Sequence, residues 1–140
     1  MAAFDVYYLN DHARACSVVF EISPVERILS EHCEILERFS EYISGEFYKR
    51  ELPCILRLLE EIQEEIELAI IDGFVFLKEG RKGLGAHLFE SQNGKLPVIG
   101  VAKTYFKGCE TYRTVYRGNS VKPLYVSSIG IDLDCAAKLI

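Results

Sequence analysis

The chain lacks a long apolar run, and its N-terminus lacks basic residues. None of its apolar stretches reaches the roughly 18 residues that a membrane-spanning helix requires. The N-terminus carries Asp5 where a secretory signal would carry lysine or arginine. These absences argue against a membrane protein and against export, and we expect a cytoplasmic protein.

The chain also lacks any pair of cysteines in the CxxC spacing. Its five cysteines are scattered along the sequence. The adjacent His32 and Cys33 are weak evidence for zinc, because neighbouring side chains on a strand point to opposite faces. We therefore expect five free thiols in a reducing compartment.

An excess of basic residues is absent as well, since the net charge is −5. This argues against a protein that coats nucleic acid non-specifically. The charge is uneven, with six basic residues and one acid between Lys95 and Lys122. Such a stripe could steer a polyanion to one face, and a solvated charged surface is the alternative.

What is present suits one globular domain spanning residues 1–140, with 49% apolar and 26% charged residues. Residues 25–40 are ambiguous: composition favours a helix, whereas a meander topology favours a strand, which we prefer. Pro53 either kinks a helix over 46–67 or marks its true first turn. We predict strands at 2–9, 13–21, 68–77, 97–103, 111–117 and 121–128, with further helices at 84–92 and from about Asp132. This order indicates an α/β fold with a mixed sheet and flanking helices, arranged as in ribonuclease H-like nucleases.

Three carboxylates stand out from this pattern. Asp5 lies in the first strand, Glu51 in the main helix, and Asp72 at the end of an apolar run. An acid in apolar surroundings is costly unless it is paired or ligated. A cap, a turn or a salt bridge to Lys103 or Arg50 would explain each acid singly. Together they suggest a Mg²⁺ site, because Mg²⁺ prefers hard oxygen ligands and can activate water for phosphodiester cleavage.

The sequence resembles the endonuclease V family over nearly the whole chain. The resemblance rests on Asp5-Val6-Tyr7-Tyr8, Tyr42-Ile43-Ser44-Gly45 with Arg50-Glu51 after it, Ile71-Asp72-Gly73, Gly85-Ala86-His87-Leu88, Pro97 to Lys103 (PVIGVAK) and Pro123 to Ser127 (PLYVS). The most specific features are the spacing from Tyr42 to Glu51 and the strand that ends in Lys103.

The resemblance implies a Mg²⁺-dependent endonuclease, with Mn²⁺ as a substitute, that nicks inosine-containing DNA or RNA. Cleavage would fall at the second phosphodiester 3′ of the lesion, as part of DNA repair. The substrate is thus nucleic acid with a deaminated adenine. The family roles carry over as follows: Asp5, Glu51 and Asp72 for metal, Lys103 for the scissile phosphate, Tyr42 for the wedge, Gly45 and Phe47 for the flipped base, and Gly83 and Gly85 opposite them.

The chain departs from the family pattern in three places. Ser44 replaces the proline of the wedge, and Phe74–Leu77 replace a His-Pro-Arg-like segment. Ile129 stands where family members carry a histidine near the metals. Asp132 or Asp134 could serve instead, although Asp132 equally suits a helix N-cap.

These departures keep two other functions open. One is a module that binds nucleic acid without cutting it efficiently, and the other is a related structure-specific nuclease. His87 is expected among the nucleic-acid-binding residues, although a buried, hydrogen-bonded histidine is the more ordinary role for this position. The sequence does not distinguish DNA from RNA.

Overall fold

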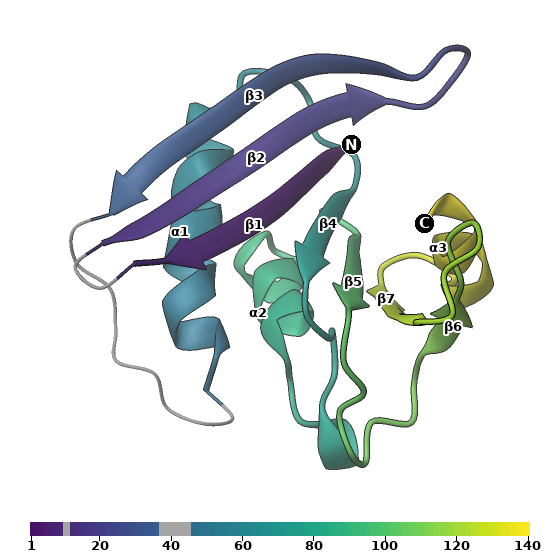
Figure 1. Ribbon diagram of the computed structural model, residues 1–140. Coiled ribbons are helices and arrows are strands. Elements are labelled where there is room, and N and C mark those ends of the chain that lie inside the picture. The colour runs from purple at the N-terminus through teal and green to yellow at the C-terminus, as the bar shows by residue number, and fades with distance from the viewer. Residues whose placement is uncertain (10–11, 37–45) are drawn as a thin grey trace. The chain divides into compact units, whose positions relative to one another are not determined.

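The computed structural model describes residues 1–9, 12–36 and 46–140 (Figure 1). The chain divides into two compact units, residues 1–69 and residues 70–140. Among the described residues, no helix is both long enough and apolar enough to cross a bilayer. That residues 1–140 form one domain stays a prediction.

The first unit contains an antiparallel meander of three strands. They are β1 (Ala2–Tyr8), β2 (Ala13–Glu21) and β3 (Arg27–Leu36), in the order β3-β2-β1. The strand preferred for residues 25–40 is confirmed over Arg27–Leu36. Its many glutamates favour a helix locally, but pairing with β2 along its whole length outweighs that preference.

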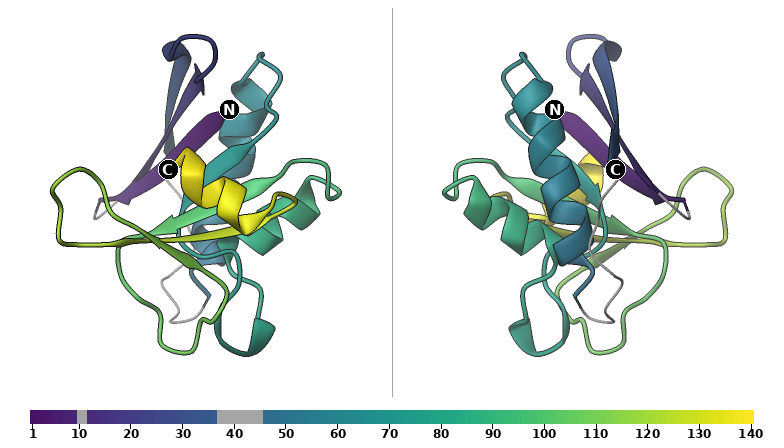
Figure 2. Two further views of the ribbon diagram at one scale, coloured as in Figure 1. Left: turned by 90° about the vertical axis from the view of Figure 1, so that its right-hand side faces the viewer. Right: turned by 90° about the vertical axis from the view of Figure 1, so that its left-hand side faces the viewer.

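One face of this meander is buried and the other is open. Ala2 and Phe4 of β1 and alternate residues of β2 are buried, as a strand's two-residue period requires. Helix α1 (Tyr48–Glu61) lies against this meander (Figure 2). It packs on the buried face, since Arg50 stacks on Tyr8 and Arg57 pairs with Glu34. The opposite face of β1 carries the exposed Asp5.

Helix α1 differs from its predicted range of 46–67. It ends at Glu61, and Ile62 is already extended. The acidic run from Glu60 to Glu67 explains the early end, because carboxylates at a helix C-terminus oppose the helix dipole and no basic residue occupies the last turn. Pro53 lies inside the helix, so the interpretation of Pro53 as the first turn is wrong.

The second unit contains β4 (Ala69–Asp72), which starts at the unit boundary, followed in space by β5 (Val98–Ala102), β7 (Leu124–Ile129) and β6 (Arg113–Val115). β7 is antiparallel to both β5 and β6. The Gly73 amide, just past β4, donates to Val101 O near the end of β5, so these two strands run in the same direction. The predicted α/β fold with a mixed sheet is thereby confirmed.

Helices and a short turn complete this unit. Helix α2 (Leu84–Ser91) follows the 3₁₀ turn η1 (Lys78–Gly80) and packs against β5. Helix α3 (Leu133–Leu139) lies against β7 and β6, as Figure 2 shows in yellow. Both helices fall where the sequence predicts them.

The strand predicted over residues 68–77 is wrong beyond Asp72. Gly73 has a φ of 136°, a conformation that other residues rarely adopt, and it ends the strand. Phe74 and Val75 are nevertheless buried, and the Val75 amide donates to Ser127 Oγ at 3.0 Å. The apolar run therefore reflects burial rather than a continuous strand.

The prediction of five free thiols is also wrong. Cys16 and Cys33 form a disulfide between β2 and β3, whereas Cys54, Cys109 and Cys135 are free. The sequence spacing concealed this pair, because 17 residues and a turn separate two side chains that the strand register places opposite one another.

Candidate functional site

Glu51 is a buried carboxylate in the first unit, with an exposed fraction of only 4%. It lies on the face of α1 that also buries Cys54, Ile55 and Leu58. The helical period brings it to this face, because residues three and four apart share one side of a helix. A charge in this position needs compensation from its surroundings.

The groups around Glu51 respond to its charge. Burial raises the pKa of the Tyr8 hydroxyl well above its usual value, and the nearby Glu51 carboxylate raises it further. Burial raises the pKa of the Cys54 thiol to about 11, again with a contribution from Glu51. The Arg50 guanidinium lies 3.7 Å from the centre of the Tyr8 ring. Tyr8, which is not among the predicted site residues, thus belongs to the environment of Glu51.

Asp5 occupies a different setting in the same unit. It is exposed, and it lies on the face of β1 opposite to Phe4 and Tyr8. Its register partner on β2 is Cys16. The strand position predicted for Asp5 is therefore correct, whereas its role in binding a metal stays a prediction.

In the second unit the structure brings Asp72 and Lys103 together. Asp72 ends β4, Lys103 follows β5, and these two strands are neighbours. Lys103 Nζ lies 3.2 Å from Asp72 Oδ2; the Lys103 side chain is largely exposed and that of Asp72 is 45% exposed. An exposed pair of this kind contributes only about 0–1 kcal/mol to stability. The salt bridge considered as a structural explanation for Asp72 is thus present, and it leaves both groups accessible.

A carboxylate set of this kind fits Mg²⁺ chemically, since all three groups offer hard oxygen donors. Within the described part of either unit, however, no group of three or more His, Cys, Asp or Glu side chains is placed to hold a metal ion. The joint role of Asp5, Glu51 and Asp72 in binding a metal therefore stays a prediction.

The two substitutes considered for the family histidine already have other partners. Asp132 caps α3, with its Oδ1 accepting a hydrogen bond of 2.9 Å from the Cys135 amide. This contact is the main reason that the pKa of Asp132 lies below its usual value. Asp134 forms an ion pair of 2.6 Å with Arg113. Ile129 ends β7, so the chain offers no imidazole at that position.

The glycines predicted to face a flipped base are packed inside the second unit. A Cβ on Gly83 would collide with Phe74 O, and one on Gly85 would lie 2.7 Å from Val75 Cγ2. Their small size is thus required for the approach of α2 to the segment after β4. Burial lowers the pKa of the neighbouring His87. A binding role for these three residues stays a prediction.

The remaining predicted contacts lie at the start of α1. Phe47 is its N-cap residue and is 40% exposed. Tyr42 and Gly45, together with Ser44, fall outside the described residues.

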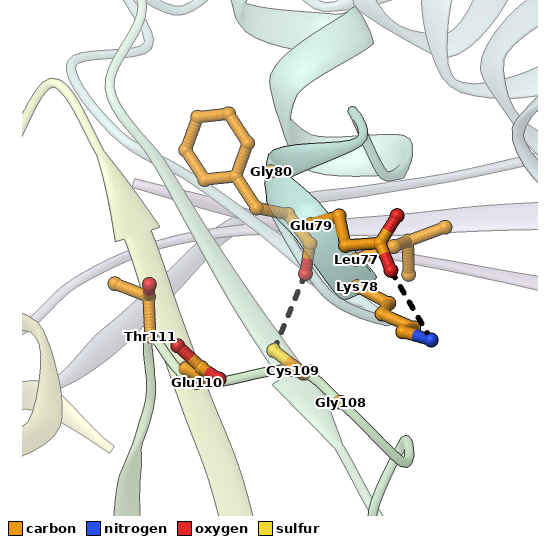
Figure 3. A pocket seen from close by; sticks show the side chains of 9 residues that line it. Leu77, Lys78, Glu79, Gly80, Gly108, Cys109, Glu110 and Thr111 are labelled. Atoms are coloured by element: carbon orange, nitrogen blue, oxygen red, sulfur yellow. Dashed lines mark hydrogen bonds and ion pairs between the residues drawn. The ribbon is translucent and has the colours of Figure 1, made fainter.

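A pocket that the sequence did not predict lies in the second unit (Figure 3). It has a volume of about 720 Å³, and its lining comes from two loops, Phe76–Gly80 and Gly108–Thr111. The Cys109 thiol donates to Phe76 O at 3.4 Å across the two loops, and Lys78 pairs with Glu79. The loops follow two neighbouring parallel strands, and that topology is the signal that could have located the pocket.

An aromatic cluster also lies in the second unit. Tyr105, Tyr112, Tyr125, Phe74 and Phe106 form ring pairs with centroids 5.3–6.5 Å apart. Tyr105 and Phe106 are each more than 40% exposed, two and three residues after Lys103. Exposed aromatic rings beside basic side chains are typical of surfaces on which nucleic-acid bases stack.

Comparison with known proteins places this geometry in a family. The family model described as Endonuclease V matches residues 1–139. Endonuclease V of Azotobacter vinelandii is 32% identical over 112 residues, and that of Bacillus subtilis is 34% identical over 98 residues. These alignments cover 80% and 68% of this chain but only 49% and 40% of the two relatives, so the chain spans about half the length of the curated relatives it matches.

Solved structures agree. Endonuclease V of Streptomyces avermitilis superposes on 98% of this chain, with a TM-score of 0.84 and 26% identity, and 68% of its own chain is covered. Endonuclease V of Ciona intestinalis, solved in complex with a 24mer DNA containing an inosine followed by a ribo-adenosine, gives a TM-score of 0.83 over 99% of this chain and 75% of its own, at 21% identity. The sequence resemblance, the match along residues 1–139 and the shared fold lead to one conclusion: this chain belongs to the endonuclease V family.

Proposed function

We propose that this protein is a divalent-metal-dependent endonuclease that nicks inosine-containing nucleic acid at the second phosphodiester 3′ of the lesion. The observation that carries the proposal is the family match along residues 1–139, which includes every residue assigned to the site. The inosine-containing DNA bound to the Ciona intestinalis relative supports this substrate class. The cytoplasmic location expected from the sequence belongs to the same proposal.

In this proposal Asp5, Glu51 and Asp72 hold Mg²⁺, which Mn²⁺ can replace. A divalent cation bound to carboxylates supplies a Lewis acid and an activated water for phosphodiester hydrolysis. Glu51 is suited to such a role because its buried carboxylate would gain a strong counter-charge. Asp72 is suited because it is accessible at the end of β4.

Lys103 would contact the scissile phosphate. Its ammonium group lies next to Asp72, is 77% exposed, and can therefore turn toward an incoming anion. A cation at this point would offset the negative charge that develops as the bond breaks. The exposed Tyr105 and Phe106 would add stacking surface for the bases nearby.

The experiment is a nicking assay on a labelled duplex with one deoxyinosine, and on the matching RNA with one inosine. Each is incubated with Mg²⁺, with Mn²⁺ or with EDTA. The proposal predicts a single nick 3′ of the lesion that EDTA abolishes, and a substrate with adenine in place of inosine should stay intact. If folded protein made no metal-dependent nick in either substrate, the proposal would be overturned.

A second readout separates metal binding from cutting. A cation present at about 100 times its dissociation constant stabilises a folded protein by about 2.7 kcal/mol. We expect Mg²⁺ to raise the melting temperature by about 5–10 °C, and Glu51→Gln to lose this rise. Glu60→Gln is the matched control, since Glu60 lies on the same helix but is exposed.

The alternative function is recognition without efficient cutting. The observation that favours it is that Ile129 replaces the family histidine while Asp132 and Asp134 are engaged in a cap and an ion pair. Tight, lesion-dependent binding in a gel-shift assay, with no nick in Mg²⁺ or Mn²⁺, would establish this alternative.

A further inference from the structure

The disulfide in the first unit joins two directly opposite residues. Cys16 on β2 and Cys33 on β3 are register partners, and their Cα atoms are 4.2 Å apart. This short separation is typical of the non-hydrogen-bonded pairs of an antiparallel ladder, where facing side chains come closest. The pairing of the two strands thus places both sulfurs within bonding reach.

This disulfide is accessible to solvent. Cys33 is exposed and Cys16 is partly so. Two of the free cysteines differ in this respect, because Cys54 and Cys109 are buried and their thiols donate to backbone carbonyls. Small thiols and disulfides in solution can therefore reach the Cys16–Cys33 pair and the exposed Cys135, whereas the two buried thiols are shielded.

Strand β3 contributes no buried apolar side chain among the described residues. Every buried apolar side chain that the described part of the meander contributes comes from β1 or β2. On the face toward α1, β3 carries Ser30, His32 and Glu34, which are only partly buried. Glu34 also pairs with Arg57 of α1. An edge strand held mainly by backbone bonds has low local stability, so a covalent link to β2 contributes much of its order.

The disulfide and Asp5 lie in the same row of paired residues across the meander. Asp5 pairs with Cys16, and Cys16 pairs with Cys33, so the three residues form one row across β1, β2 and β3. Directly opposite residues project from the same face of a sheet. The row therefore lies on the open face, with Asp5 at one end and the accessible Cys33 at the other.

We propose that Cys16 and Cys33 form a reversible redox site. In its oxidised state the disulfide orders strands β1, β2 and β3 around the row of paired residues that ends in Asp5. The reagents are low-molecular-weight thiols and disulfides. The importance of Asp5 for catalysis rests on the proposed function, but the redox site itself does not.

Two molecules of the reagent thiol reduce the Cys16–Cys33 disulfide in two steps. One reagent thiolate attacks Cys33 Sγ, the Sγ–Sγ bond breaks, and Cys16 Sγ takes a proton. A second reagent thiol then displaces Cys33 and leaves as the reagent disulfide. Two electrons and two protons pass from the reagent to the cysteine pair, and the reverse reaction restores the bond.

The test compares the oxidised and reduced wild-type protein with Cys16→Ser/Cys33→Ser and Cys135→Ser. Cys135→Ser is the matched control, because Cys135 is exposed and free in the second unit. Mass spectrometry after alkylation counts thiols in a series of glutathione redox buffers. Melting temperature and hydrogen exchange of the β1 and β3 amides report order, and Mg²⁺ titration of nicking reports the site.

We expect the oxidised protein to melt about 5–15 °C above the reduced form. Reduction should accelerate exchange in β3 and β1, and should raise the Mg²⁺ concentration for half-maximal nicking by about tenfold. Cys135→Ser should keep this response, and the double variant should behave as the reduced protein in every buffer.

Two results would overturn the proposal. One is a protein whose cysteines all alkylate in every glutathione buffer. The other is a disulfide whose reduction leaves β1 exchange and Mg²⁺ dependence unchanged, which would make it a local staple only. If neither form nicks any substrate, the proposed function fails, whereas thiol counts and hydrogen exchange still decide the redox site.

Discussion

Two acids assigned to one metal site lie in opposite environments. Glu51 in the first unit is 4% exposed, and its charge contributes to the raised pKa values of Tyr8 and Cys54. The Asp72 side chain in the second unit is 45% exposed, and its Oδ2 lies 3.2 Å from Lys103 Nζ. A buried carboxylate must have its charge compensated at every moment, whereas an exposed one exchanges partners at little cost. The comparison teaches that equal importance for catalysis need not mean equal importance for stability.

The largest expected effect is on nicking. Glu51→Gln and Asp72→Asn should each lower the single-turnover nicking rate about 100- to 1,000-fold, because each removes a charged ligand from the proposed cation site. Glu60→Gln, which is exposed on α1, should retain the wild-type rate. If one of these two variants cut within threefold of the wild-type rate, the acid it replaces would not be required for nicking. The two acids would then differ in function as well as in burial.

The next effect concerns Lys103 and sharpens the account of Asp72. Lys103→Gln should lower the nicking rate about 100-fold through the loss of a cation near the phosphate. The free energy of unfolding should change by less than about 1 kcal/mol, since the ion pair with Asp72 is exposed. Rates on DNA and urea denaturation of the same preparations would be compared. An unchanged rate would limit Lys103 to its salt bridge.

A smaller effect concerns Asp132 in the second unit, whose carboxylate accepts a hydrogen bond from the Cys135 amide. Asp132→Ala should lower the melting temperature by about 2–5 °C, because it removes the cap of α3. Asp132→Asn should keep the melting temperature, since asparagine caps equally well. Thermal denaturation measures both. If Asp132→Asn abolished nicking without loss of stability, Asp132 would be a ligand as well as a cap.

The smallest effect concerns pH and tests the partly buried His87 of the second unit. The lowered pKa of His87 means that the folded chain binds this proton less readily than the unfolded chain. Its contribution to stability is therefore complete above about pH 6.5 and is lost as the pH falls through the folded-state pKa. His87→Gln should flatten the decline of the urea midpoint between pH 6.5 and pH 5. Above pH 7.5 the urea midpoints of the wild type and of His87→Gln should change with pH in parallel. If the midpoint declined equally steeply in both proteins below pH 6.5, His87 would be excluded as the cause of the decline.

Much of the fold follows from local pattern. Alternation in β1 and β2, the helical period of α1 and the cap at Asp132 each depend on neighbours within a few residues, so they can be read along the chain. The same holds for the placement of Asp5 on a strand and of Glu51 on a helix. The family could also be recognised from the sequence alone, because its motifs keep their spacing.

Only the tertiary structure decided how distant residues meet. The Cys16–Cys33 disulfide depends on the register of β2 and β3, and the contact of Lys103 with Asp72 depends on β4 and β5 being neighbours. The burial of Glu51 beside Tyr8 depends on where α1 packs on the meander. The end of β4 at Asp72 was missed because an apolar run records burial, while backbone conformation at Gly73 and a bond from Val75 to Ser127 determine where the strand stops. Residues far apart in sequence are brought together by packing, and no local pattern records that choice.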